Sequence, residues 1–284
     1  MPIVFKNVGY EYGPKTPFAH TALNDINAEI KTGSLTAIIG ATGSGKSTLV
    51  QHLNGLLQPT SGEVEILDHT MVAGVKSRNL KQLRSQVGLV FQFPEMQLFE
   101  ETIYKDVSFG PKNFGFSEAD IKENVEKALT LVGIDKELWE RSPLDLSGGQ
   151  KRRVAIAGVL ATDPNVIVLD EPTAGLDPQG SKDMMNLFIR LNKDFGKTII
   201  MVTHDMDHVL NYAEDVLVLD KGSVYFSGKA STFFKDQTML DALGFVAPKI
   251  LQLKTMLLEK GIDTKDSLDL DAIVTLIKEA RAHE

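Results

Sequence analysis

The sequence contains no cysteine, a single tryptophan and no long run of apolar residues. Without cysteine, the chain can form no disulfide, no thiolate metal site and no thiol nucleophile. No apolar stretch approaches the roughly 18–20 residues that a membrane-spanning helix needs. The first residues also lack the charged-then-apolar pattern of a signal peptide. We therefore expect a cytosolic chain that meets a membrane only through another protein.

Basic residues are outnumbered by acidic ones. Thirty lysines and arginines stand against 38 aspartates and glutamates, which gives a formal net charge of −8. This balance argues against non-specific binding to nucleic acid, although a local basic patch is compatible with it. The length of 284 residues favours one large domain with an appendage, and the hydrophobic content of 43% is typical of a globular protein.

The stretch 35–50 carries the strongest functional signal. An apolar run predicts a buried strand, the next residues fit G-x-x-x-x-G-K-[ST], and leucines at helical spacing follow as far as Leu57. Glycines let successive N–H groups converge on an anion, and the following helix adds the positive end of its dipole. Lys46 should reach the β- and γ-phosphates and Ser47 should ligate Mg²⁺. The candidate nucleotide-binding residues are Gly40, Ala41, Thr42, Gly43, Ser44, Gly45, Lys46, Ser47 and Thr48.

Two kinds of hydrophobic pattern organise the rest of the first 230 residues. Alternating apolar residues near the N-terminus, at 3–8 and 23–30, predict an antiparallel sheet. Short apolar runs separated by helical stretches predict a parallel sheet covered on both faces; they lie at 87–91, 166–169, 198–202 and 216–219. Functional residues should collect beyond the carboxyl ends of parallel strands. Gly40, Gln92, Asp170 and His204 fall there.

Two further motifs suit nucleotide chemistry. Asp170 and Glu171 end an apolar run; the first can hold Mg²⁺ through water and the second can orient the attacking water. Ser147, Gly148, Gly149 and Gln150 begin a predicted helix and form a second candidate anion site. A second site of this kind makes sense if it serves a nucleotide held by another cassette.

Three features each leave two interpretations open. Tyr12 could stack on a base or simply pack beside a turn. Six phenylalanines in 91–116 could form core or a socket for another protein. Two amphipathic helices, predicted at 248–260 and 269–280, could pack on the main domain or contact another subunit.

The combination of GATGSGKST, a strand-end glutamine, LSGGQ, VLDEP, AGLD and the pair Thr203-His204 resembles the ATP-binding cassette (ABC) family over residues 1–230. The resemblance implies an α/β P-loop NTPase core, with an antiparallel β subdomain and a helical subdomain at about 95–162. It also implies a small helical C-terminal extension at 231–284. ATP and Mg²⁺ are the cofactors that this resemblance implies.

The same resemblance implies roles for single residues. Tyr12 matches the aromatic that stacks on the base, and Gln92 matches the residue that senses Mg²⁺ and the membrane partner. Ser147–Gln150 matches the sequence that closes over the γ-phosphate of the opposite subunit. Asp177 matches the loop residue that crosses the dimer interface, and His204 the γ-phosphate switch. The implied catalytic set is Lys46, Gln92, Glu171 and His204, and the implied metal set is Ser47, Gln92 and Asp170.

Within this family, two longer stretches are similar to the energy-coupling factor (ECF) importers of vitamins and cobalt: FQFPEMQLFEETIYKDVSFGP (91–111) and LSGGQKRRVAIAGVLA (146–161). The pair Ala41-Thr42 and the triplet Lys151-Arg152-Arg153 resemble the second of the two ATPases in such systems. The resemblance implies a heterodimer with a related ATPase, a transmembrane scaffold (T) component and, indirectly, a substrate-capturing (S) component. It places the chain at the cytoplasmic face of the membrane, with no nucleic acid partner.

Other functions remain as alternatives at this point. An ATPase of a metal or peptide ABC transporter is the main competitor. A DNA-repair type ABC ATPase would need a long coiled-coil insertion before LSGGQ, and a ribosome-binding type would normally carry two cassettes. A kinase outside the family would leave LSGGQ without a purpose.

Overall fold

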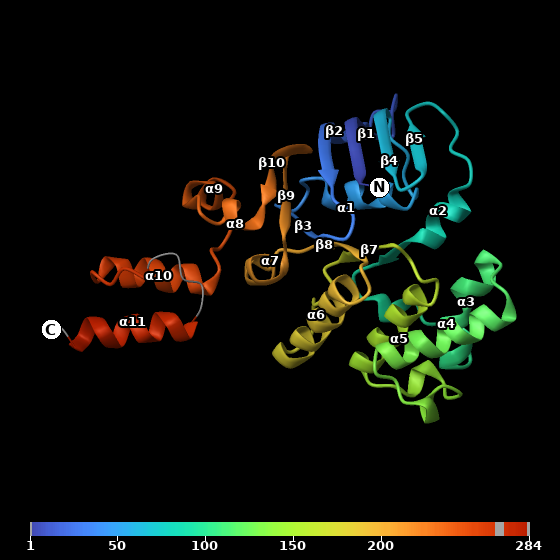
Figure 1. The fold of residues 1–284 in the computed structure, drawn as a ribbon. Coiled ribbons are helices and arrows are strands. Elements are labelled where there is room, and N and C mark those ends of the chain that lie inside the picture. Colours follow the sequence, from blue (N-terminus) through green and yellow to red (C-terminus); the bar gives the residue numbers. More distant parts are fainter. Residues whose placement is uncertain (1, 265–269, 283–284) are drawn as a thin grey trace.

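Two β-sheets, with helices between and around them, make up most of the structure (Figure 1). The computed structural model describes residues 2–264 and 270–282. The observed mixed α/β architecture confirms the predicted fold class.

The larger sheet has six strands in the order β10-β9-β3-β8-β7-β6. Five of them run parallel, and β10 pairs antiparallel with β9. The strands are β3 (Leu35–Gly40), β6 (Val87–Val90), β7 (Val166–Asp170), β8 (Thr198–Val202), β9 (Asp215–Asp220) and β10 (Ser223–Lys229). The predicted parallel sheet is therefore confirmed, and β10 is an addition that the apolar runs did not indicate.

The smaller sheet is antiparallel, in the order β2-β1-β4-β5. Its strands are β1 (Ile3–Tyr12), β2 (His20–Ile30), β4 (Ser61–Ile66) and β5 (His69–Val72). Because β1 continues to Tyr12, this tyrosine lies at the end of a strand and pairs in register with His20.

Helix α1 (Lys46–Leu53) packs in the apolar layer between the two sheets. Alternation along β3 divides its side chains between the two faces of the large sheet. Ile38 joins the layer with α1, whereas Ala37 and Ile39 join the cluster on the opposite face. The expectation of a helical face as far as Leu57 is wrong: α1 ends at Leu53, and Gly55 turns the chain with φ +67°.

A group of helices lies between β6 and β7, in the region where helical periodicity was predicted. It packs against the face of the sheet that also carries α6. The elements are η1 (Pro94–Gln97), α3 (Ile103–Phe114), α4 (Glu118–Leu131), η2 (Lys136–Leu138), η3 (Pro143–Asp145) and α5 (Gly148–Leu160). The remaining helices of the first 230 residues are α2 (Leu80–Gln86), α6 (Pro178–Lys193) and α7 (Met206–Tyr212).

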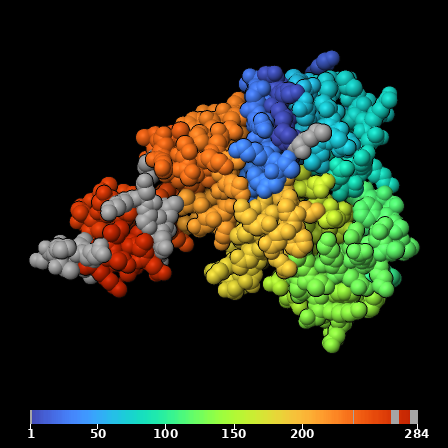
Figure 2. Space-filling model, in the orientation of Figure 1, coloured from blue at the N-terminus to red at the C-terminus, as the bar shows by residue number. Residues whose placement is uncertain are grey.

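Four helices follow β10: α8 (Ala230–Phe233), α9 (Gln237–Ala242), α10 (Lys249–Glu259) and α11 (Leu270–Ala282). The first two, not predicted, bury Phe233 and Leu240 against the large sheet. Figures 1 and 2 show α10 and α11 together as a lobe beside the rest of the molecule. Ile273 is fully buried, whereas Met256 and Leu258 are exposed. The predicted start of the last helix, Asp269, lies outside the described residues.

Within residues 2–264 and 270–282, no helix is long and apolar enough to cross a lipid bilayer.

Candidate functional site

The topology of the large sheet brings the predicted site residues to one edge. Strands β3, β8, β7 and β6 are neighbours and parallel, so their carboxyl ends lie side by side. The loop that holds Lys46 follows β3, and His204 follows β8. Asp170 ends β7, Glu171 comes next, and Gln92 follows β6. The strand order therefore places these residues in a row, as expected for an open parallel sheet.

The loop after β3 has the geometry of a phosphate cradle. Lys46 Nζ donates to the carbonyl oxygens of Gly40 at 2.8 Å and Ala41 at 2.9 Å, so its ammonium is held against the loop. Gly45 has φ +102°, and a Cβ there would lie 2.7 Å from the carbonyl oxygen of Ala22. Only glycine fits without strain. Within the described residues, the buried Ser44 Oγ has no hydrogen-bond partner, which leaves it free for a phosphate oxygen.

Charges behind the loop are close enough to act on one another. Burial lowers the pKa of Lys46, and the nearby carboxylates of Glu171 and Asp170 oppose that shift. Burial raises the pKa of Asp170; the charge of Glu171 raises it further and Lys46 counteracts it. The free site thus holds two acids whose mutual repulsion a cation would relieve.

Glu171 is held in an unusual backbone conformation. Its φ is +49°, in the left-handed region that side chains other than glycine rarely adopt. Its backbone N–H donates to the Val202 carbonyl oxygen at 3.0 Å. Its Oε1 lies 2.8 Å from His204 Nδ1, while 80% of the His204 side chain remains exposed. This contact joins the residue that follows β7 to the loop that follows β8.

The residues predicted to hold Mg²⁺ offer few protein ligands. Throughout the described part of the chain, no group of three or more His, Cys, Asp or Glu side chains could hold a metal. Mg²⁺ keeps several waters and is commonly bound by one or two protein oxygens together with substrate phosphates. The Ser47 hydroxyl and the Asp170 carboxylate match this sparse donor set.

A cavity of about 180 Å³ opens beside the phosphate loop. Tyr12 stands at it, with its hydroxyl 3.2 Å from Thr48 Oγ1 and its ring edge-on to Tyr10 at 4.8 Å between centroids. The remaining lining residues are His20, Ala22, Gly43, Gly45, Lys46, Ser47 and Thr48. No motif indicated His20, which reaches the cavity because it pairs with Tyr12 across β1 and β2.

The second candidate anion site lies at the start of α5, away from this cavity. Ser147 caps the helix: its Oγ accepts from the Gln150 backbone N–H at 3.4 Å, and Gln150 Oε1 accepts from the Ser147 N–H at 3.0 Å. Gly148 and Gly149 are exposed and neither has a positive φ. Apart from the adjacent residues and the helix's own backbone, a Cβ on either glycine would meet no heavy atom of the described chain within 4 Å. Neither glycine is therefore required by the fold of this chain.

Two other predicted residues lie near the starts of helices. Asp177 caps α6, because its Oδ1 accepts from the Gly180 N–H at 2.7 Å. Gln92 is exposed, one residue before the Phe93 N-cap of η1.

The phenylalanine-rich segment is largely on the surface. Phe93, Phe99 and Phe109 are 43%, 63% and 44% exposed, and the last two pack edge to face with 4.9 Å between ring centroids. The core interpretation is therefore wrong for these three, although Phe116 packs against the core.

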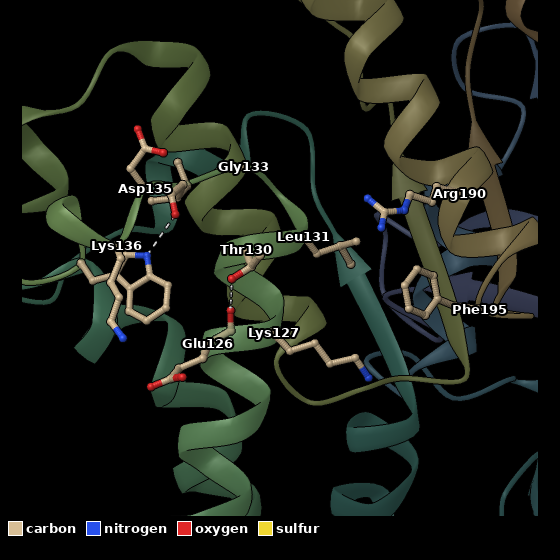
Figure 3. Close-up of a pocket in the computed structure, with 11 residues that line it drawn as sticks. Glu126, Lys127, Thr130, Leu131, Gly133, Asp135, Lys136, Arg190 and Phe195 are labelled. Atoms are coloured by element: carbon tan, nitrogen blue, oxygen red, sulfur yellow. Dashed lines mark hydrogen bonds between the residues drawn. The ribbon is translucent and has the colours of Figure 1, made fainter.

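A cavity of about 680 Å³ lies elsewhere (Figure 3). It is bounded by α4, η2, α6 and the segment after α6, and its lining includes Lys127, Trp139, Arg190 and Phe195. None of the predicted site residues lines it.

Arg152 is a buried residue that bonds to two other segments of the chain, and the sequence did not indicate this role. Its side chain is 4% exposed and forms a two-pronged ion pair with Glu95, with N–O distances of 3.0 Å. Its Nη1 donates to the Ala174 carbonyl oxygen at 2.7 Å. The only sequence signal was three consecutive basic residues, Lys151–Arg153, which does not tell which of them is buried.

A glycine loop with the geometry of a phosphate cradle after β3, and two acids where β7 ends, lie on one parallel sheet. This arrangement is typical of P-loop nucleotide-binding proteins. Residues 23–174 match the family described as "ABC transporter". The energy-coupling factor transporter ATP-binding protein EcfA2 of Spiroplasma kunkelii is 52% identical over 99% of this chain and 92% of its own length. EcfA2 of Lactiplantibacillus plantarum is 55% identical over 92% of this chain and 88% of its own length.

Solved structures of ABC proteins are similar to this chain in fold and in sequence. The cbiO1 protein of Clostridium perfringens, described as part of the ABC transporter complex cbiONQ, has a TM-score of 0.73 and 40% identity, covering 88% of this chain and 97% of its own. The ATP-binding cassette MJ0796, solved as a dimer with ADP and Pi, has a TM-score of 0.70 and 31% identity, covering 80% and 98%. The chain belongs to the ABC transporter family, among the ATP-binding proteins of energy-coupling factor transporters.

Proposed function

We propose that this chain is the ATP-hydrolysing subunit of an ECF-type importer of vitamins or other micronutrients, and that it works in a head-to-tail pair with a second, related ATPase. In this proposal residues 1–230 form the cassette and 231–284 form an extension. The observation that carries the paired arrangement is the contrast between the two anion sites. A Cβ on Gly45 would clash with the Ala22 carbonyl oxygen, whereas a Cβ on Gly148 or Gly149 would meet nothing within 4 Å outside its own helix backbone and adjacent residues.

Glycines in the first turn of a helix cost stability relative to alanine. Their presence at an exposed helix start, beside a serine and free backbone N–H groups, suits close approach of a phosphate held by another molecule. MJ0796, which is similar to this chain, was solved as a dimer with ADP and Pi. In the proposed pair, each nucleotide lies between one chain's Lys46 loop and the other chain's Ser147–Gln150.

The chain's own groups then have distinct roles. Lys46 and Ser44 hold phosphate oxygens, and Tyr12 lies where a base would stack. Ser47, Asp170 and Gln92 are the residues that would hold Mg²⁺, which neutralises phosphate charge when bound. Glu171 orients and deprotonates water, and the hydrogen bond to His204 fixes its carboxylate. Asp177 lies on the loop proposed to face the second ATPase.

The exposed phenylalanines suit a docking surface for a membrane scaffold (T) component. Phe93 follows directly after Gln92, Met96 (84% exposed) and Phe99 lie in the same segment, and Phe109 is on α3 with its ring against that of Phe99. A protein seated there would contact the same loop that reaches the nucleotide. The substrate-capturing (S) component would act indirectly through that scaffold, and the chain would lie peripherally at the cytoplasmic face of the membrane. Met256 and Leu258, on the C-terminal lobe, are candidates for a further contact with the second ATPase.

The proposal is tested first by nucleotide binding. We expect Lys46→Ala to weaken the affinity for Mg-ATP by about 10-fold or more, because charge-assisted hydrogen bonds to phosphate are strong. Lys122→Ala, on an exposed position of α4, is the matched control and should change nothing. Identical ATP titration curves for Lys46→Ala and the unmodified chain would refute the assignment of the cradle.

A further inference from the structure

The buried guanidinium of Arg152 joins three segments that each carry or adjoin a proposed site residue. Arg152 lies on α5, two residues after Gln150. Its Nε and Nη2 each donate to one carboxylate oxygen of Glu95, in η1, at 3.0 Å. Its Nη1 donates to the carbonyl oxygen of Ala174 at 2.7 Å. Ala174 lies between Glu171 and Asp177, so the three segments meet at one side chain.

The same side chain also supports the exposed aromatic surface. The Arg152 guanidinium lies over the Phe93 ring, with 5.7 Å from Cζ to the centroid. The ring also lies near the loop after β7, because a Cβ on Gly175 would lie 3.5 Å from Phe93 Cε1. Phe93 itself has φ +55° and directly follows Gln92. The ring thus lies close both to Arg152 and to the segment that leads to Asp177.

The Arg152–Glu95 pair differs from the other arginine ion pairs of the described chain. Arg153–Asp183 and Arg190–Asp194 are long, at 3.8 and 3.7 Å, and solvent-exposed. Such pairs contribute little. The Arg152 pair is two-pronged and its arginine is buried, so it fixes geometry as well as charge. Burial raises the pKa of Glu95, but the hydrogen bonds and charge of Arg152 outweigh it and hold that pKa below its usual range.

We propose that Arg152 is a positioning residue that couples the docking surface to both nucleotide-facing segments. Its contacts with Glu95 and Phe93 connect it to the loop after Gln92. Its hydrogen bond to Ala174 positions the loop between Glu171 and Asp177. If a docked protein moved η1, the planar Arg152 guanidinium would transmit that movement to the start of α5 and to the loop after β7. This inference rests on the proposed function for its consequence, but the connection itself can be measured without it.

The test uses the full chain with Arg152→Lys, which keeps the charge but cannot form the fork, and Glu95→Gln, which keeps the shape but removes the charge. Arg190→Lys is the matched control, because its ion pair with Asp194 is exposed. In the nucleotide-free chain, we expect the amide hydrogen exchange of residues 92–98 and 172–177 to become about 10-fold faster in Arg152→Lys and in Glu95→Gln. In the Arg190→Lys control, we expect the exchange of both segments to stay unchanged. Unchanged exchange of both segments in Arg152→Lys and Glu95→Gln would overturn the proposal.

A second readout separates positioning from simple loss of stability. In the complex isolated from membranes, we expect Arg152→Lys to lower kcat by about 10-fold while the KM for ATP stays within about 2-fold, since the Lys46 cradle is untouched. A fall in kcat that only matches a fall in the folded fraction would overturn the proposal. If the unmodified complex hydrolyses no ATP, the proposed function fails, and the exchange result alone then supports or overturns the connection through Arg152.

Discussion

The two anion sites of this chain differ in what their glycines touch. At the Lys46 loop, a Cβ on Gly40 would lie 2.3 Å from the Leu219 carbonyl oxygen, and one on Gly45 would lie 2.7 Å from that of Ala22. At the start of α5, a Cβ on Gly148 or Gly149 would meet nothing within 4 Å outside the helix's own backbone and the adjacent residues. Gly43 of the Lys46 loop is equally open, but its φ of +81° favours glycine, whereas Gly148 and Gly149 have no positive φ. The first site is built by the fold of its own chain. The second is displayed by the fold and, in our proposal, is completed by a neighbour.

The largest effect should come from the residue that acts on water. We expect Glu171→Gln to lower ATP turnover by about 10²–10⁴-fold, because it removes the proposed general base while keeping shape and hydrogen bonding. Binding of Mg-ATP, measured by calorimetry, should persist. Glu123→Gln, at an exposed position of α4, is the matched control and should leave turnover unchanged. Full residual hydrolysis in Glu171→Gln would remove this residue from its proposed role.

A pair of alanine substitutions contrasts the two sites directly. Gly45→Ala forces a side chain into φ +102° against a backbone oxygen, so we expect a loss of more than about 2 kcal/mol in the free energy of unfolding. Gly149→Ala should instead stabilise the free chain by about 0.5–1 kcal/mol, as alanine does in a helix. Thermal unfolding measures both. In Gly149→Ala, stability should not fall, but ATP turnover and ATP-dependent pairing should. Undiminished turnover in this variant would count against a nucleotide site shared between two chains.

A substitution on the proposed docking surface should impair assembly with membrane partners without lowering the stability of the chain. Because Phe99 is 63% exposed, Phe99→Ser should change the free energy of unfolding by less than about 0.5 kcal/mol. We expect its recovery with membrane partners, measured by co-purification, to fall by about 10-fold, as for an aromatic anchor in an interface. Phe18→Ser, at 87% exposure in the turn between β1 and β2, is the control. Equal losses of stability and assembly would favour a packing role for Phe99.

The smallest effect concerns Asp170. Burial raises its pKa, so the folded chain binds this proton more tightly than the unfolded chain does. At neutral pH the ionised carboxylate therefore lowers the free energy of unfolding. This destabilisation is absent at pH values below the pKa that Asp170 has in the unfolded chain. It reaches its full size only above the pKa that Asp170 has in the folded chain.

We accordingly expect Asp170→Asn to raise the Tm of the free chain by about 2–4 °C at neutral pH, with a gain that shrinks toward pH 4. The exposed Asp241→Asn, for comparison, should leave Tm unchanged. Mg²⁺-dependent ATP affinity should fall in Asp170→Asn only. A lower Tm for Asp170→Asn at neutral pH would show that the ionised side chain is stabilising instead.

Features fixed by local pattern could be predicted from the sequence. The apolar runs at β6, β7, β8 and β9 gave the parallel sheet, and their carboxyl ends located Gln92, Asp170 and His204. Short elements with weak periodicity were missed, namely β5, β10, α8 and α9. They owe their structure to neighbouring surfaces more than to their own pattern.

Contacts between distant segments could not be predicted. Nothing in the run Lys151–Arg153 indicates that the middle residue is buried against Glu95, because that depends on how η1 folds over α5. The conformation of Glu171, with φ +49°, is likewise invisible in the sequence. The exposure of Phe99 also required the packed structure, since clustered phenylalanines usually form core.

The composite site is tested most directly by a crosslink from α5. Since the chain has no cysteine, Ser147→Cys in the Glu171→Gln background supplies its only thiol. A short thiol-to-amine reagent is applied to the complex isolated from membranes, and the crosslinked peptides are identified by mass. We predict that Mg-ATP creates a crosslink from position 147 to the phosphate-loop lysine of a neighbouring ATPase. A thiol that stays equally accessible with and without Mg-ATP, in a complex that binds ATP fully, would contradict the shared pocket.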